Sequence, residues 1–220
     1  MSILKKISPL YMNKNEKYDK SYFVNNHLRL INSFCGPLVK QYYRYVASYI
    51  MARPGKLRRG DKVLDVGCGV GILVEQFNKI GYQAVGVDVN YEAIKNSICP
   101  EHCSLVKTTA KLDYPNHYFD LVVSREVLEH IPVTDLDACI NEWDRVSKGK
   151  MIHIIAVLER GLSATNDPTH VNVQSEKWWM TKFGEHSYKT IIKPQKFFFS
   201  PFGSLGYLMF VKEQRKTCSY

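Results

Sequence analysis

The stretch Lys62-Val-Leu-Asp-Val-Gly-Cys-Gly-Val-Gly71 opens with a run, Val63 to Val66, that is typical of a buried strand. Three glycines then stand at alternate positions, Gly67, Gly69 and Gly71, and the chain continues in a helical pattern. A glycine-rich turn between a strand and a helix lets a ligand approach the backbone closely and holds it at the helix N-terminus. The stretch therefore predicts an α/β fold with a ligand site at this turn.

Two acidic residues indicate what kind of ligand the turn binds. Phosphate-binding dinucleotide folds place their third glycine where this chain has Ile72. Asp65 stands two residues before the first glycine, where its negative charge would repel a phosphate and attract a cation. A second apolar run, residues 83–89, predicts a strand carrying Asp88, roughly 20 residues downstream, the spacing at which such folds bind ribose hydroxyls. The pattern predicts a positively charged ligand that contains a ribose.

With these residues and Phe119-Asp-Leu-Val-Val-Ser124, the sequence resembles the class I S-adenosylmethionine-dependent methyltransferases over about residues 61–157. The resemblance implies a Rossmann-like three-layer α/β sandwich, with a seven-stranded, mostly parallel sheet and an antiparallel last strand. It implies S-adenosylmethionine as the cofactor. Family members often carry an acid at the position of Thr108 to contact the adenine, so a hydroxyl or backbone group would serve here. The residues implied to bind the cofactor are Asp65, Gly67, Cys68, Gly69, Gly71, Asp88, Val89, Thr108, Thr109, Ser124 and Tyr22.

Length and composition indicate a single cytoplasmic domain. The chain has 220 residues, enough for one α/β domain, and no apolar span long enough for a membrane helix. Six scattered cysteines fit free thiols in a reducing compartment better than a disulfide framework. The net charge of +9 favours an acidic partner, or else a solvated basic surface. The sequence leaves the oligomeric state open.

We therefore expect one methyltransferase domain over residues 1–220, with two appended features. Residues 1–35 form an arm in which Tyr18 and Tyr22 close over the cofactor as a lid, as in similar arms of the family, or else simply anchor a surface segment. Residues 158–185 form an insertion at the acceptor site. Helices are expected at residues 37–52, 73–80, 92–97, 134–146 and 176–183, and strands at 63–66, 83–89, 104–107, 121–124, 150–157, 188–192 (extending to 199 as an alternative) and 206–211.

The segment Ser124-Arg-Glu-Val-Leu-Glu-His-Ile131 follows the fourth strand, at the edge where such folds bind ligands. If it forms a helix at once, Glu126, Glu129 and His130 share one face and can hold a divalent cation. This arrangement, with His170, is similar to two metal-dependent branches, the small-RNA 3′-end 2′-O-methyltransferases and the ubiquinone-pathway O-methyltransferases. The implied metal ligands are Glu126, Glu129, His130 and His170.

Two other interpretations of these residues stay open. In many methyltransferases a Leu-Glu-His sequence at this place only packs and hydrogen-bonds the cofactor loop. Without a metal, His170 is the predicted general base, with Asp167 orienting it and Glu126 as a further catalytic residue.

Two further motifs have competing interpretations. Trp178 and Trp179 could line an acceptor pocket or pack a helix onto the sheet. The run Cys99-Pro-Glu-His-Cys103 is a poor zinc site, because its ligands are irregularly spaced and lack a second pair.

Three functional hypotheses follow. The first is methyl transfer to an oxygen of a small polar acceptor, such as a sugar or related metabolite. The second is ribose 2′-O-methylation of RNA, favoured by the charge and the Glu-x-x-Glu-His pattern. The third is a cofactor-binding subunit without activity of its own, which the cofactor motifs alone do not exclude. Residues suited to catalysis, His170 and Glu126, favour an enzyme.

Overall fold

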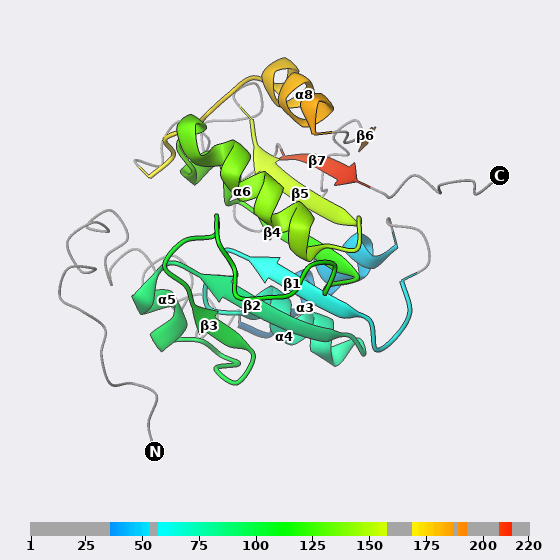
Figure 1. The fold of residues 1–220 in the computed structure, drawn as a ribbon. Helices are drawn as coiled ribbons and strands as arrows, with labels where there is room; N and C mark the ends of the chain where they lie inside the picture. The colour runs from blue at the N-terminus through cyan, green and yellow to red at the C-terminus, as the bar shows by residue number, and fades with distance from the viewer. Residues whose placement is uncertain (1–35, 53–56, 158–168, 187–188, 193–206, 213–220) are drawn as a thin grey trace.

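The computed structural model describes residues 36–52, 57–157, 169–186, 189–192 and 207–212 of the chain. Within them lies a Rossmann-like α/β fold built on one sheet, with helices on both of its faces (Figure 1). The predicted α/β class is confirmed. No helix in these ranges is both long and apolar enough to cross a bilayer. The predicted arm of residues 1–35, with Tyr18 and Tyr22, lies outside the described residues, as do residues 193–199.

Five parallel strands form the body of the sheet, in the order β3-β2-β1-β4-β5. Two more strands extend it beyond β5: β7 pairs antiparallel with β5, and β6 pairs antiparallel with β7. The bounds are β1 Lys62–Val66, β2 Gln83–Asp88, β3 Cys103–Leu105, β4 Leu121–Arg125, β5 Met151–Ala156, β6 Lys189–Ile192 and β7 Tyr207–Lys212. The third strand was predicted at residues 104–107 but spans Cys103–Leu105, the three residues that pair in register with β2.

The sheet has a hydrophobic core on each of its two faces, because successive side chains of a strand point to opposite faces. On one face, Val63 and Val123 pack with α3 (Gly36–Met51) and α4 (Ile72–Lys79). On the other face, Leu64 and Val122 pack with α6 (Val133–Val146) and α8 (Glu176–Glu185). The two faces, each covered by helices, give the three layers of the sandwich (Figure 1).

The N-termini of α6 and α5 are capped differently: α6 has no side-chain cap, whereas α5 has one. The sequence predicts that Thr134 caps α6, but the N-cap is Pro132, two residues earlier, and the Thr134 hydroxyl donates to Asp135 inside the first turn. Proline with its fixed φ is well suited to the start of a helix. The short helix α5 (Tyr91–Lys95) is capped by Asn90, whose side chain accepts the Ala93 amide at 2.9 Å.

The strand order reverses at β1, which lies between β2 and β4. In open parallel sheets, ligands bind in the crevice at the carboxyl ends of the strands where the order reverses. The glycine turn follows β1, Asp88 ends β2, and residues 126–130 follow β4. The topology therefore brings these three segments to one edge of the sheet.

Candidate active site

The glycine turn is held in place by the backbone of β2. The amides of Gly67 and Cys68 both donate to the Val87 carbonyl, at 2.8 and 3.1 Å, and the Gly71 amide donates to the Cys68 carbonyl. Gly69 has φ 55°, and a Cβ added there would meet no atom within 4 Å, so its backbone borders open space. A Cβ at Gly67 would instead meet Val127 at 2.4 Å. The open side of the turn is at Gly69, where a ligand can approach the backbone.

Asp88 faces this turn from the end of β2. One carboxylate oxygen accepts the Gly69 amide at 2.8 Å, and the other accepts the Asn90 amide at 2.8 Å. A carboxylate has about four lone-pair sites and the backbone does not fill them all, so the group can still accept a hydroxyl donor. Burial raises the pKa of Asp88, while the backbone donors at Asn90 and Gly69 act to lower it. The carboxylate is thus fixed beside the open side of the turn, as a ribose-binding acid requires.

Asp65 lies beneath the same turn on β1 and is 3% exposed. Burial is the main cause of its raised pKa, with the nearby Cys103 and Asp88 adding to the rise and Arg125 opposing it. A cationic ligand would favour the charged form of this carboxyl group. The methionine end of S-adenosylmethionine, with its ammonium and sulfonium charges, is such a ligand.

The remaining residues implied to bind the cofactor differ in their environments. The Cys68 side chain packs against Gly86 and its thiol donates to the Gly69 carbonyl at 3.7 Å. Thr108 is exposed and accepts the Ala110 amide, whereas Thr109 is buried against Cys139. Val89 is half-buried. The Ser124 hydroxyl points to His153 at 2.8 Å, and Tyr22 lies outside the described residues.

The segment after β4 does not form a helix at once, so the predicted single helical face is wrong for Glu126. Glu126 has φ 57° and donates its amide to the Ile154 carbonyl, while its carboxylate pairs with Arg125. A short 3₁₀ helix, η3 (Leu128–His130), begins only two residues later. A left-handed residue cannot belong to the same right-handed helix. Glu126 is therefore directed differently from Glu129 and His130.

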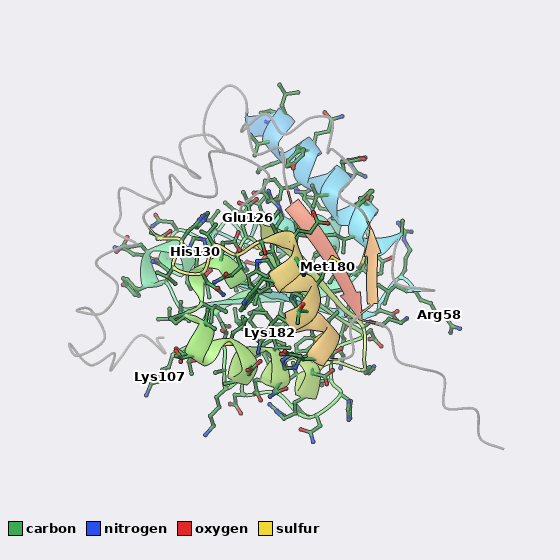
Figure 2. All side chains as sticks on the ribbon, turned by 90° about the horizontal axis from the view of Figure 1, so that it is seen from above. Arg58, Lys107, Glu126, His130, Met180 and Lys182 are labelled. Carbon is green, nitrogen blue, oxygen red and sulfur yellow. The ribbon has the colours of Figure 1, made fainter. Side chains whose placement is uncertain are left out.

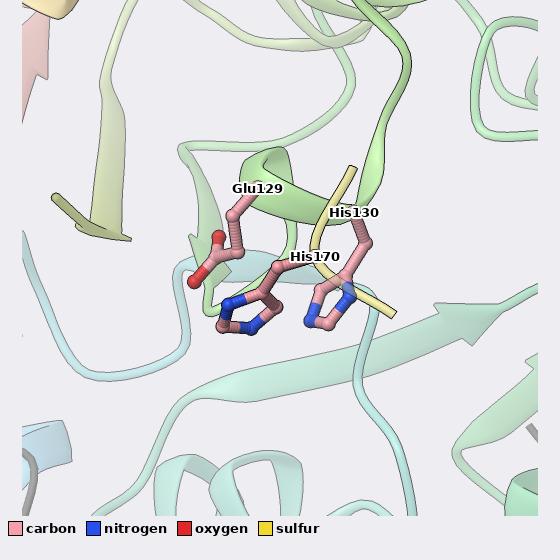
Figure 3. A group of neighbouring side chains, drawn as sticks. All are labelled: Glu129, His130 and His170. Carbon is pink, nitrogen blue, oxygen red and sulfur yellow. The ribbon is translucent and has the colours of Figure 1, made fainter. Parts of the chain in front are cut away.

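Three of the four predicted metal ligands come together. Ligand atoms of Glu129, His130 and His170 all lie within 4.8 Å of one another, and the two imidazole centroids are 4.6 Å apart. Figure 3 shows the three side chains converging from two segments, Glu129 and His130 from η3 and His170 from a separate stretch of chain. Glu126 is outside this group, and Asp167, the predicted partner of His170, lies outside the described residues.

Hydrogen bonds explain why these two distant segments meet. The amides of Val171 and Asn172 both donate to the Glu129 carbonyl, at 3.0 and 2.9 Å. His130 Nδ1 lies 3.2 Å from the Thr169 carbonyl oxygen and 3.1 Å from its hydroxyl. A carbonyl only accepts, so this contact makes Nδ1 the donor and leaves the lone pair of a neutral ring on Nε2. Ligating histidines usually donate their other N–H to a carbonyl in this way.

The donor set fits a divalent cation. One carboxylate and two imidazoles are the mixed oxygen and nitrogen ligands of zinc, iron and manganese centres. Glu129 is fully buried, whereas both histidines are half-buried and thus reach toward solvent. The arrangement can hold a cation with open coordination positions, or place an imidazole base where an acceptor would bind.

The tryptophan pair on α8 mainly packs the helix. Trp179 is fully buried and stacks on Phe183, with ring centroids 5.7 Å apart. Trp178 is partly buried against the same core, and Met180 is 45% exposed. Figure 2 shows Met180 and Lys182 on this helix. The packing interpretation holds for Trp179, whereas Trp178 also lines a cavity together with Thr181 and Glu185.

Sequence reasoning missed two features of the site. Arg125 lies over the ring of Tyr43, 4.9 Å from its centroid, and joins α3 to the segment beside Asp65. The one sequence signal for Arg125 is its position directly after the predicted strand of residues 121–124, at the edge of the sheet where ligands bind. The second is the buried pair of Ser124 and His153, whose pairing depends on the register between β4 and β5 and so has no local sequence signal.

Comparisons with known proteins agree with this geometry. The family model described as a methyltransferase domain matches residues 38–190. Ubiquinone biosynthesis O-methyltransferases of Rhodopseudomonas palustris and Bartonella bacilliformis are 35% and 31% identical to this chain over 107 and 143 residues. These regions are 46% and 62% of this chain and 41% and 56% of theirs, so the chain spans about half the length of these curated relatives.

Solved structures show the same fold. A SAM-dependent methyltransferase from Archaeoglobus fulgidus superposes with a TM-score of 0.65, over 88% of this chain and 100% of that one, at 17% identity. The family model covers well over half of this chain. The protein belongs to the methyltransferase domain family and has the fold of the class I S-adenosylmethionine-dependent methyltransferases.

Proposed function

We propose that this protein transfers a methyl group from S-adenosylmethionine to an oxygen of a small polar acceptor, such as a sugar or related metabolite. The observation that carries the proposal is the convergence of Glu129, His130 and His170 at the edge of the sheet that bears the glycine turn. The named O-methyltransferase relatives support oxygen as the methylated atom. Their acceptor is not carried over, since this chain spans only about half of their length.

The donor is proposed to lie along the glycine turn. Asp88 would accept the ribose hydroxyls, the backbone at Gly69 would contact the methionyl part, and Asp65 would face its positive charge. The hydroxyl of Thr108 is the proposed contact for the adenine. The sulfonium already makes the methyl carbon electrophilic, so the protein has mainly to align the acceptor and exclude water.

An alcohol acceptor is a poor nucleophile and needs help to lose its proton. We propose that Glu129, His130 and His170 hold a divalent cation for this purpose. When bound, the cation would supply Lewis-acid chemistry, attracting the acceptor oxygen and lowering the pKa of its hydroxyl. Without a cation, His170 is the side chain proposed to accept the proton, with Asp167 orienting its ring.

The metal proposal is tested by measuring metal content and methyl transfer together. Chelator should remove a divalent ion and lower transfer, and added divalent ion should restore both. Glu129→Gln and His170→Ala should each lose the metal. His186→Ala is a matched control, because His186 is bonded to Asp137 at the end of α8 and should not affect metal content. If methyl transfer is unaffected by chelator but is lost in His170→Ala, no cation takes part in it. The result would then assign the role of general base to the His170 imidazole.

Glu126→Gln tests whether the fourth predicted ligand joins a bound cation. Glu126 pairs with Arg125 and lies outside the three-residue group, so we expect Glu126→Gln to keep its metal. Loss of metal in this variant would mean that the segment after β4 rearranges when the cation binds.

Methylation of RNA ribose is the second candidate function, and the net charge of +9 favours it. Against it, Figure 2 shows Arg58 and Lys107 at opposite sides of the molecule rather than in one patch. Lys182 is engaged with Asp137 and Glu185. A cofactor-binding subunit without activity is the third candidate, and it predicts donor binding with no turnover.

The whole chain is proposed to be one methyltransferase domain with a complete seven-stranded sheet whose last strand is antiparallel. The antiparallel pairing of β7 with β5 supports this sheet. Residues 1–35 are proposed to act as a lid over the donor. Residues 158–185 are proposed as the acceptor-site insertion, because His170 belongs to this stretch and its neighbours bond to Glu129.

A further inference from the structure

Three buried cysteines meet behind the glycine turn. Cys99 Sγ lies 3.6 Å from Cys103 Sγ, and Cys68 hydrogen-bonds to Cys103 through its side chain. The three residues are 4%, 6% and 9% exposed for Cys99, Cys103 and Cys68. They come from three segments, because Cys68 is in the turn, Cys99 precedes the third strand and Cys103 begins it. Pairing of Cys103 with Gly86 in the sheet places the group behind the turn.

The sulfurs are in contact with the backbone that would hold the donor. The Cys99 thiol donates to the Gly71 carbonyl at 3.2 Å. A Cβ added to Gly71 would lie 2.7 Å from both the Cys99 and the Cys103 sulfur. Gly71 is also the N-cap residue of α4, and its carbonyl accepts the Glu75 amide. The two sulfurs thus pack directly against the end of the glycine turn.

The group also favours one reactive thiolate. Contact with the Cys68 and Cys99 thiols lowers the pKa of Cys103 well below its usual range, while the same contacts and burial raise the pKa of Cys68 and Cys99. A thiolate is the nucleophilic form of cysteine. Peroxide-sensing cysteines combine a low pKa with a neighbouring resolving cysteine and access to solvent, and this buried pair gains that access only by local opening.

We propose that Cys103 and Cys99 form a peroxide-oxidised disulfide site that controls binding at the glycine turn. The Cys103 sulfur attacks one oxygen of hydrogen peroxide, the O–O bond breaks, and the leaving hydroxide takes up a proton as water. Cys103 becomes a sulfenic acid. The Cys99 sulfur then loses its proton and attacks Cys103, the S–O bond breaks, and a second water leaves. Two thiols are oxidised by two electrons, and one peroxide is reduced to two waters.

The oxidation changes the geometry behind the turn. A disulfide needs about 2.05 Å between the sulfurs, so the pair must move well inside its present 3.6 Å separation. That movement withdraws the Cys99 sulfur from the Gly71 carbonyl, and the S–S bond consumes both the Cys99 thiol and the Cys103 thiolate. In the oxidised protein the glycine turn therefore no longer has the conformation that is proposed to bind the donor. The site thereby couples the redox state of the pair to the affinity for the donor.

This coupling is reciprocal, because a ligand that binds one state better must stabilise that state. Both thiols are buried, so oxidation is expected to proceed through local opening of the turn. Bound S-adenosylmethionine favours the closed, reduced turn and should slow disulfide formation. The coupling rests on the proposed donor site, whereas formation of the disulfide does not.

The test treats the full chain with hydrogen peroxide and maps its disulfides by mass spectrometry without reduction. We expect a Cys99–Cys103 link, slower formation when S-adenosylmethionine is present, and donor affinity reduced roughly 5- to 150-fold. Dithiothreitol should restore the affinity. Cys99→Ser should form no link and keep its donor affinity after peroxide. Cys139→Ser is the matched control, because Cys139 is also buried but its sulfur contacts Thr109 rather than another thiol.

The outcomes separate the two proposals. A Cys68–Cys103 link in place of the predicted one, or thiols that stay reduced at peroxide levels that oxidise free cysteine, would overturn the inference. A Cys99–Cys103 link that leaves donor affinity unchanged would overturn the control of binding. Reduced protein that binds no donor would contradict the proposed function, while the disulfide map would still decide the chemistry of the cysteines.

Discussion

At the scale of single residues, Asp88 makes the most direct prediction about the donor. Its carboxylate is held by the Gly69 and Asn90 amides beside the open side of the glycine turn. Replacing it in Asp88→Ala removes a charged acceptor, which should weaken donor binding by about 1.5–3 kcal/mol, measured by calorimetry. Asp61→Ala is the control, because Asp61 bonds to the Arg58 amide at the opposite end of β1. Equal affinities for Asp88→Ala and the unmodified protein would remove the ribose assignment.

A second prediction at this scale concerns pH. The pKa values of Asp65 and Asp88 are both raised, mainly by burial. A positively charged donor binds the ionised form of Asp65 better, so donor and proton compete for this group. Affinity should therefore be highest well above these pKa values and fall as the pH drops through them, by at most about tenfold per pH unit for each proton taken up.

The variant Asp65→Asn separates this effect from the titration of Asp88. It should bind the donor more weakly near neutral pH and lose part of the fall in affinity at acidic pH. The check is calorimetry of donor binding over a series of pH values for both proteins. Affinity of the unmodified protein that stays constant, or rises, as the solution is acidified would contradict the predicted role of Asp65.

At the scale of elements, two glycines with the same backbone strain make a matched pair. Gly69 (φ 55°) and Gly60 (φ 91°) are both left-handed, and an added Cβ meets nothing within 4 Å at either position. Each alanine substitution should destabilise the fold by roughly 1–2 kcal/mol, because a side chain disfavours this conformation. Only Gly69→Ala places its methyl group where the donor is proposed to lie.

We therefore expect Gly69→Ala to lose donor affinity and Gly60→Ala to retain it, at similar cost in unfolding free energy. Denaturant unfolding measures the first quantity and calorimetry the second. If both variants bind the donor as well as the unmodified protein, the glycine turn does not contact it.

The proposed lid of residues 1–35 gives a further prediction about an element. If Tyr18 and Tyr22 close over the donor, amide hydrogen exchange across residues 11–30 should slow when S-adenosylmethionine is added. Exchange that does not change on adding saturating donor would leave these tyrosines as anchors of an ordinary surface segment.

Local patterns predicted the elements of the sheet better than the details of the site. The glycine turn, the strand ending in Asp88 and the strand that contains Ser124 are encoded by adjacent residues, and all three lie where they were predicted. Glu126 was wrongly grouped on a helix, because helical spacing carries no sign that its backbone is left-handed. The cysteine group depends on the register of Cys103 with Gly86, which no local pattern reveals.

At the scale of the whole molecule, the donor should stabilise the fold because it binds the folded protein. At a concentration of about 100 times its dissociation constant, the expected gain is about 2.7 kcal/mol in unfolding free energy. For a chain of this size, each kcal/mol raises the melting temperature by roughly 2–4 °C. Thermal melts with and without donor measure this shift, and Asp88→Ala should show a smaller shift at the same concentration.

The kind of acceptor is also a property of the whole molecule. The net charge of the chain is +9, and two of the basic residues in its described part, Arg58 and Lys107, lie on opposite sides in Figure 2. Binding of a nucleic acid through phosphate contacts would weaken steeply with salt, whereas a small neutral acceptor would bind with little salt dependence. The separation of these two basic residues, together with an ordered group at Glu129, His130 and His170, favours the small acceptor.

Methyl transfer in a cell extract tests the central claim most directly. The extract is incubated with this protein and S-adenosylmethionine labelled in its methyl group, and small molecules and RNA are then separated and analysed by mass spectrometry. The account predicts a labelled methyl group on an oxygen of a small polar metabolite, absent when Asp88→Ala or His170→Ala replaces the unmodified protein. Label on RNA ribose alone, or no labelled product from a protein that binds the donor, would contradict it.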